Sequence, residues 1–180
     1  MSIYDYIIKE NVINGAERQF ILDADFNWTK HSWTDVNYNS VEGDEFELSI
    51  FWPDANSMEG KTLHGITQRC VQIFSEKFPD SNVTKYSSPR LNKYSMNTQM
   101  DDHVDHINSL FDGNDRGIPI LSMVGVFNDN YEGGEFVFND DHVVNLRAGD
   151  VLMFPSVFLF KHRVNTVTDG TRFSFVSWGF

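Results

Sequence analysis

The stretch Thr171-Arg172-Phe173-Ser174-Phe175-Val176-Ser177-Trp178, near the end of the chain, decides the fold class. Side chains of an extended strand point alternately to opposite faces. One face therefore carries Arg172, Ser174, Val176 and Trp178, and the other carries Phe173, Phe175 and Ser177. This alternation predicts a β-strand whose aromatic face packs on a core while the other face presents polar groups.

Short apolar runs separated by turn residues continue this pattern back to about residue 82. They predict strands at 118–127, 135–138, 142–146, 151–154, 160–167 and 171–178. Gly133-Gly134, Asn139-Asp140, Ala148-Gly149-Asp150 and Asp169-Gly170 are turn signals between them. Six short strands with no helix between them indicate an antiparallel sandwich or barrel, so the chain is expected to be mainly β.

The first half of the chain is less regular. Apolar residues recur every three or four positions over 61–78 and predict an amphipathic helix with Cys70 on its buried face. The runs 20–22 and 46–52 read as strands on either side of a long polar loop, 29–44. This loop contains His31, Trp33 and Tyr38, and we expect it to be exposed and to act as a lid over a substrate.

Composition limits the classes of function. A chain of 180 residues fits one domain. Its formal charge of −12 disfavours nucleic acid and anionic membranes as partners but suits a basic polypeptide. A single cysteine excludes an internal disulfide or a thiolate cluster, so any metal must be held by His, Asp or Glu. The first residues contain no signal peptide pattern, and we expect a cytoplasmic protein.

Three residues are candidate metal ligands. His103 and Asp105 are two positions apart, so both face the same side if the segment is extended. His162, 59 positions further on, begins a late strand and can supply a third ligand. Two imidazoles and one carboxylate leave open positions suited to non-haem Fe(II). If the segment were helical, His106 would replace His103; the extended reading leaves His106 outside the site.

Arg172, ten positions after His162, supports the metal hypothesis. An arginine that faces inward needs an anion, and its planar guanidinium suits a carboxylate. Facing sheets lie about 10 Å apart, so a five-carbon diacid on the metal can reach a guanidinium on the opposite sheet. A surface arginine in a salt bridge is the alternative reading.

These residues resemble the 2-oxoglutarate and Fe(II)-dependent oxygenases, in particular their prolyl 4-hydroxylase-like branch, including small bacterial and phage members. The similarity covers residues 90–180 in order. It rests on Leu91-Asn92-Lys93-Tyr94, His103-Val104-Asp105, the run from Val126 to Phe136, the run from Arg147 to Ser156, His162, and the run from Val167 to Trp178.

The resemblance implies a double-stranded β-helix, or jelly roll, at 89–180, braced by strands, a lid loop and a helix at 1–88. It assigns the iron to His103, Asp105 and His162, and the 2-oxoglutarate C5 carboxylate to Arg172. It places Tyr94 on the cosubstrate and Trp178 near the metal. Where some members have a second tyrosine beside the arginine, this chain has Val126, so the carboxylate is expected to contact Ser122, Ser174 or water.

The implied reaction hydroxylates an unactivated C–H bond, with succinate and CO₂ as co-products and ascorbate as reductant. The branch suggests a prolyl residue of a peptide or protein as the substrate. A hydroxylase of a free amino acid or metabolite remains open. So do a nucleic-acid demethylase, although Trp178 occupies the position of its second arginine, a non-catalytic jelly-roll binding module, and a zinc hydrolase. The oligomeric state is not predicted.

Overall fold

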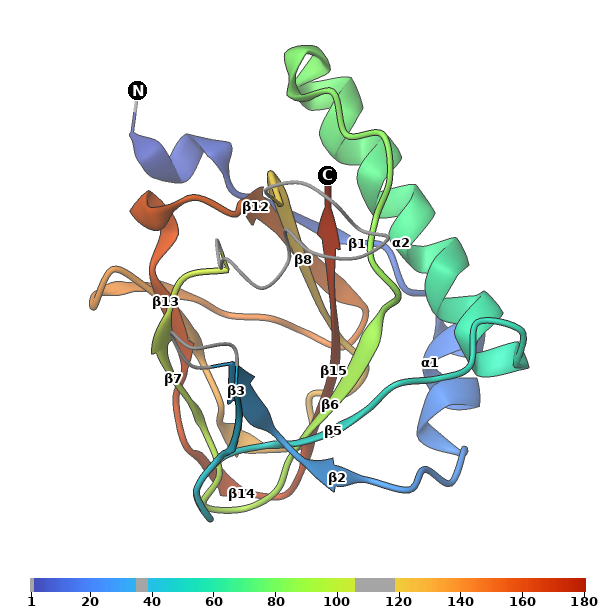
Figure 1. The fold of residues 1–180 in the computed structure, drawn as a ribbon, viewed down its shortest axis with the longest axis vertical. Coiled ribbons are helices and arrows are strands. Elements are labelled where there is room, and N and C mark those ends of the chain that lie inside the picture. The colour runs from blue at the N-terminus through green and yellow to red at the C-terminus, as the bar shows by residue number, and fades with distance from the viewer. Residues whose placement is uncertain (1, 35–38, 106–118) are drawn as a thin grey trace.

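The computed structural model describes residues 2–34, 39–105 and 119–180 (Figure 1). Strands dominate the described residues, and two α-helices, α1 (Gly15–Leu22) and α2 (Met58–Lys77), both lie in the first half of the chain. The described residues also form three short 3-10 helices: η1 (Ile3–Tyr6) near the start of the chain, η2 (Pro79–Ser81) directly after α2, and η4 (Phe158–Phe160) late in the chain. None of the described helices is long and apolar enough to cross a membrane.

The largest sheet has seven strands, and all of its strand pairs are antiparallel. Its order is β1 (Ile8–Asn11), β12 (Asp150–Pro155), β8 (Leu121–Val126), β15 (Arg172–Gly179), β6 (Arg90–Tyr94), β5 (Ser49–Phe51) and β2 (Thr29–Lys30). The deciding stretch of the sequence is β15, the central strand. It pairs with β8 on one side and with β6 on the other.

A second sheet of four strands faces the first. Its order is β11 (His142–Val144), β10 (Phe136–Phe138), β13 (His162–Val164) and β7 (Met100–His103). Figure 1 shows β13 and β7 across the molecule from β15 and β6. Aromatic side chains fill part of the space between the sheets; the rings of Phe136 and Phe154, one from each sheet, have centroids 5.8 Å apart. This arrangement confirms the expected jelly-roll fold.

Two small antiparallel pairs complete the fold. The first pairs β14 (Val167–Asp169) with β9 (Glu132–Gly133), and the second pairs β3 (Ser32–Thr34) with β4 (Ser40–Glu42). After β14 the chain reverses at Gly170, which has a φ of 74° and which places Arg172 at the start of β15. A Cβ at Gly170 would lie 2.9 Å from the Asn130 carbonyl oxygen, so glycine suits both the conformation and the space.

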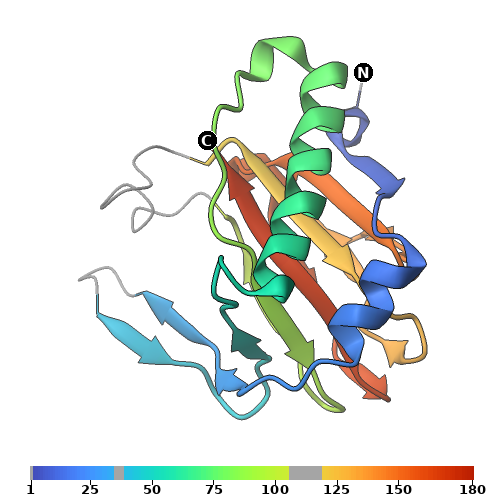
Figure 2. The ribbon, with the colours of Figure 1, turned by 90° about the vertical axis from the view of Figure 1, so that its right-hand side faces the viewer.

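The long helix α2 packs on the outer face of the large sheet, as Figure 2 shows. The Ser57 hydroxyl caps its first turn by accepting a hydrogen bond from the Gly60 amide. The predicted helical spacing of apolar residues is confirmed, because Leu63, Ile66 and Cys70 are fully buried against the sheet. Burial raises the pKa of the Cys70 thiol to about 12.

Two expectations for the first half of the chain are wrong. Residues 20–22 belong to helix α1, whose start is fixed by a capping box between Asn14 and Glu17. The expected loop at 29–44 instead contains β2 and the β3–β4 hairpin, and His31 within it is buried. A run of three apolar residues is too short to show a period, and the cap was the better signal.

Candidate functional site

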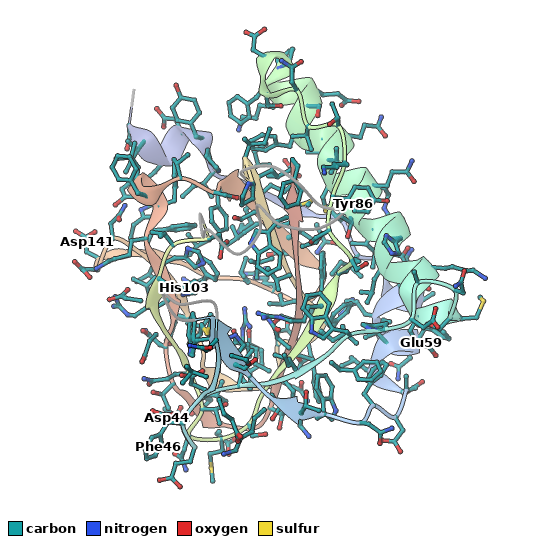
Figure 3. The ribbon with its side chains drawn as sticks, in the orientation of Figure 1. Asp44, Phe46, Glu59, Tyr86, His103 and Asp141 are labelled. Atoms are coloured by element: carbon teal, nitrogen blue, oxygen red, sulfur yellow. The ribbon has the colours of Figure 1, made fainter. Side chains whose placement is uncertain are left out.

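The three candidate ligands meet at one end of the small sheet. His103 ends β7, His162 begins β13, and the two residues are direct partners across the antiparallel pair. Their side chains therefore share one face, and the ring centroids lie 4.3 Å apart. Figure 3 shows His103 far from Glu59 and Tyr86, which lie by α2, so the site is on the side of the large sheet away from that helix.

The donor atoms of the triad converge. Asp105 lies 3.5 Å from His103 (Oδ1 to Nε2) and 3.8 Å from His162 (Oδ2 to Nε2), and ligand atoms of all three residues lie within 4.8 Å of one another. Nδ1 of His103 donates a hydrogen bond to the Asp101 carbonyl oxygen at 2.7 Å, and Nδ1 of His162 donates one to the Phe160 carbonyl oxygen at 2.9 Å. A carbonyl only accepts, so Nδ1 of each ring is the donor to the backbone, and Nε2 is the ring atom that faces the Asp105 carboxylate.

Burial and charge prepare these groups to bind a cation. Burial lowers the pKa of His162 to about 4, so its imidazole is neutral at pH 7. Burial also opposes ionisation of Asp105, but His162, His103 and the nearby Ser122 hydroxyl hold the pKa of this carboxyl well below its usual range. The ring of Phe136 stacks on that of His162, with centroids 5.0 Å apart. The site thus combines an ionised carboxylate with a neutral imidazole in apolar surroundings.

This donor set fits a divalent transition metal. The Asp105 Oδ2 atom is buried and has no hydrogen-bond partner among the described residues, although its carboxylate is charged. Leaving such an atom unpaired costs about 1–3 kcal/mol or more, and a metal ion would offset that cost. Two nitrogen ligands and one oxygen ligand on one face match the facial triad of non-haem iron sites.

Arg172 lies on the facing sheet and is only 1% exposed. Its Nη1 donates to the Ser174 hydroxyl at 2.9 Å, whereas its Nε and Nη2 are buried without a partner in the described structure. The guanidinium carbon lies 4.9 Å from the centroid of the Tyr94 ring. No ion pair joins Arg172 to a carboxylate of the described residues, so a buried cation is present without its anion.

A cavity of about 260 Å³ lies between the two sheets and contains the triad. Its walls combine apolar side chains with a few polar ones. They are formed by His31, Ser32, Trp33, Trp52, Arg90, Asn92, Tyr94, Met100, His103, Val104, Asp105, Val124, Phe136, His162, Val164, Val176 and Trp178. Arg172 is next to this lining, in contact with Tyr94.

Of the other residues expected to contact the cosubstrate, some lie near Arg172 or the cavity and one lies far from Arg172. Ser174 contacts Arg172 and pairs with Val126, and Trp178 lines the cavity. Ser122 pairs with Trp178, at the other end of β15 from Arg172, and its hydroxyl lies 2.6 Å from that of Ser156. Ser122 therefore does not lie beside Arg172. The register of β8 against β15, which the sequence does not reveal, decides this.

The expected lid residues are partly described. Trp33 lines the cavity, and its ring meets that of His103 edge to face with centroids 5.8 Å apart. Its indole N–H donates to the Glu47 carboxylate at 2.8 Å, and His31 Nδ1 lies 2.9 Å from the same carboxylate. Tyr38 and His106 lie outside the described residues.

Sequence reasoning missed Glu47 and Arg90. The Glu47 carboxylate binds the side chains of His31 and Trp33 and thereby fixes the position of these two cavity-lining residues. Arg90 lines the cavity between the rings of Trp52 and Trp178. A signal for Arg90 existed, because it precedes Asn92 and Tyr94 at spacings of two, and alternate residues of a strand share a face.

The family assignment follows from sequence comparisons. A family model described as the 2OG-Fe(II) oxygenase superfamily matches residues 89–180. A PKHD-type hydroxylase of Hyphomonas neptunium is 31% identical over 182 residues, which cover 93% of this chain and 74% of that protein. A PKHD-type hydroxylase of Acinetobacter baumannii is 36% identical over 100 residues, 52% of this chain and 43% of that protein. The chain matches less than half the length of several such relatives.

Solved structures share the fold at low identity. A prolyl hydroxylase of Trichoplax adhaerens, in complex with a peptide fragment of a hypoxia inducible factor, superposes with a TM-score of 0.70 at 15% identity, covering 97% of this chain and 83% of that one. The viral collagen prolyl hydroxylase of Paramecium bursaria Chlorella virus-1, in its 2OG complex, gives 0.68 at 12% identity, covering 96% and 94%. The fold, the convergent triad and the family match together show that this chain belongs to the 2OG-Fe(II) oxygenase superfamily.

Proposed function

We propose that this chain is an Fe(II)- and 2-oxoglutarate-dependent hydroxylase that acts on a prolyl residue of a cytoplasmic peptide or protein. One observation carries the proposal. A triad of metal-ligating donors lines the cavity, and on the facing sheet, beside the cavity lining, lies a buried guanidinium that has no carboxylate partner among the described residues. A dicarboxylate that binds a metal at one end and the arginine at the other meets both needs.

His103, Asp105 and His162 would hold the iron, each through one ligand atom. When bound, Fe(II) with 2-oxoglutarate and O₂ supplies the oxidation that hydroxylates a C–H bond and yields succinate and CO₂. The backbone carbonyls of Asp101 and Phe160 keep the two imidazoles in the required tautomer and orientation. The ionised Asp105 balances part of the charge of the metal.

Arg172 would bind the far carboxylate of 2-oxoglutarate, with Ser174 orienting the guanidinium from one side. Tyr94 is 3% exposed, lines the cavity and contacts Arg172, so it would contact the part of 2-oxoglutarate that lies between the metal and the arginine. The apolar walls, including Val124, Phe136 and Val176, would exclude water from the reacting carbon. These roles are binding, orientation and exclusion of water.

The choice of a prolyl substrate rests on relatives. The curated relatives are called PKHD-type hydroxylases, and several of the solved neighbours are prolyl hydroxylases, one of them in complex with a peptide. The edge of the cavity formed by Trp33 and Trp52 offers indole surfaces of the kind that suit a pyrrolidine ring.

The test measures succinate release from 2-oxoglutarate by the full chain with Fe(II) and ascorbate. Prolyl peptides are then examined for a mass gain of 16 Da. We expect Arg172→Gln to raise the KM for 2-oxoglutarate about 100-fold, equivalent to about 2.7 kcal/mol, because a charge-assisted pair is lost.

Arg163→Gln is the matched control, since Arg163 lies on β13 and contacts Asp102 and Asp140 rather than the cavity. Its KM is expected to equal that of the wild type. Absence of succinate release from the metal-loaded wild type would refute the proposed activity, and an unchanged KM in Arg172→Gln would remove Arg172 from the cosubstrate site.

A further inference from the structure

A second arginine faces the cavity, and the reaction proposed above gives it no role. Arg90 begins β6 and shares the cavity face of that strand with Asn92 and Tyr94. Its guanidinium carbon lies 5.9 Å from the centroid of the Trp52 ring and 5.8 Å from that of Trp178. Two indoles therefore hold the planar group in place.

The terminal nitrogens of Arg90 have no hydrogen-bond acceptor among the described residues. Its Nε donates to the Asn92 side-chain oxygen at 3.0 Å, which orients the guanidinium and leaves both Nη groups free to donate. Within the described chain no carboxylate forms an ion pair with Arg90, and the neighbouring Trp178 Nε1 is buried without a partner. Burial lowers the pKa of Arg90, and the charge of the Asp105 carboxylate, which forms no ion pair with Arg90, opposes this effect only in part.

Arg90 is separate from the arginine assigned to 2-oxoglutarate. In the β6–β15 register Tyr94 pairs with Arg172, whereas Arg90 pairs with Val176, four residues along each strand. Four residues of a strand span about 13 Å. The two guanidinium groups also lie on different rings, Arg172 on Tyr94 and Arg90 on Trp52 and Trp178, so we expect two distinct places for an anion. Trp52 is 50% exposed, which puts the second place at the mouth of the cavity.

We propose that Arg90, held between Trp52 and Trp178, binds a carboxylate of the substrate. This inference rests on the proposed hydroxylase function and narrows its substrate class to molecules that carry a carboxylate close to the hydroxylated residue. The carboxylate can be the α-carboxylate of a free or C-terminal prolyl residue, or the side chain of an acidic residue beside it. A chain with a net charge of −12 otherwise repels anions, so a local cation is needed to select one.

Binding is measured by calorimetry on the full chain, without added metal, using two pairs of probes. The first pair is N-acetyl-L-proline and N-acetyl-L-prolinamide. The second is acetyl-Gly-Pro-Glu-amide and acetyl-Gly-Pro-Gln-amide. In at least one pair we expect the acid to bind at least 10-fold more tightly than its neutral partner. The pair that discriminates identifies the source of the carboxylate.

Arg90→Gln is expected to reduce this preference to about one, and Arg90→Lys to restore part of it. Lys93→Gln is the matched control, because Lys93 lies on the same strand but faces Trp28 on the other side of the sheet. Arg172→Gln should keep the preference. Equal binding of acid and amide by the wild type, a preference that survives Arg90→Gln, or one that is lost in Arg172→Gln would each overturn the inference.

Succinate release separates this inference from the proposed function. When succinate release is measured without a prolyl substrate, the KM of Arg90→Gln for 2-oxoglutarate should equal that of the wild type. A large rise in that KM would assign Arg90 to the cosubstrate and refute the inference while the hydroxylase function stands. If the wild type releases no succinate, the proposed function fails, and the calorimetry still decides whether Arg90 binds carboxylates.

Discussion

The two faces of the seven-stranded sheet differ in composition: the outer face is apolar and packs on a helix, and the inner face carries polar groups around the cavity. The outer face packs Leu91 and Phe175 against Leu63 of helix α2 in an apolar core. The inner face carries mostly polar and aromatic side chains. Those that line the cavity are Arg90, Asn92, Tyr94 and Trp178, and Arg172 and Ser174 lie beside it. Neighbouring residues of one strand thus face opposite surroundings.

This difference shows how the fold separates stability from chemistry. The outer face buries apolar area and stabilises the sheet, at about 25 cal/mol per Å². The inner face contains buried polar groups without partners, which cost stability and which a metal, a cosubstrate and a substrate would satisfy. Substitutions on the two faces should therefore change different measured quantities.

The largest expected effect is on the cavity side. His162→Ala removes one of three metal ligands, so we expect succinate release to fall at least about 10³-fold, or about 4 kcal/mol. In the wild type, Fe(II) should raise the midpoint of thermal unfolding, and in the variant it should not.

His142→Ala is the control for this substitution. His142 lies on the same sheet, in β11, and its ring stacks on that of Tyr4 with centroids 3.8 Å apart. It should keep both the activity and the response to Fe(II). Normal turnover in His162→Ala would contradict the ligand assignment.

The next effect is on the helix side. Leu63 is fully buried between α2 and the sheet, so Leu63→Ala should lower the free energy of unfolding by about 2–5 kcal/mol in urea. At temperatures where the variant stays folded, its KM for 2-oxoglutarate should not change. Leu159→Ala, at a residue 46% exposed, should cost far less. A changed KM in Leu63→Ala would show that the two faces are coupled.

The smallest effect is a pH dependence on the helix side. The Cys70 thiol has a pKa of about 12 when folded, against an ordinary value of 9.0. Above pH 9 the unfolded chain loses this proton and the folded chain keeps it, so stability falls as pH rises from 9 toward 12. At pH 10 the loss is about 1.4 kcal/mol relative to Cys70→Ala. Equal slopes for the two proteins between pH 8 and 10 would contradict this expectation.

Much of the fold could be predicted from local sequence patterns. The period of α2 and the alternation of β15 are long enough to fix both the type of element and the buried face. Turn residues with positive φ, such as Asn139 and Gly149, mark strand ends as predicted. The spacing of His103 and Asp105 was a weak signal by itself, and Arg172 and the family resemblance were needed to predict the group of ligands that the structure brings together.

The remaining features depend on strand register and on contacts between distant segments. Ser122 was one of three expected contacts of the far carboxylate, with Ser174 and water, but the pairing of β8 with β15 puts it opposite Trp178. The alternation of β6 puts Arg90 on the same face as Asn92 and Tyr94, but only the pairing of β6 with β15 shows what that face meets. Glu47 gains its role only when the hairpin folds over the cavity. No local pattern contains this information.

The cavity wall also includes His31, Trp33 and Trp52, which precede the segment that the family model matches. The chain thus draws its metal ligands from one part of the polypeptide and a portion of its entrance from another. We expect changes at the exposed Trp52 to alter which molecules enter, whereas changes at Trp33 would also reach His103, whose ring it contacts. An exchange of the segment before residue 89 between relatives is therefore expected to change the selectivity of the site.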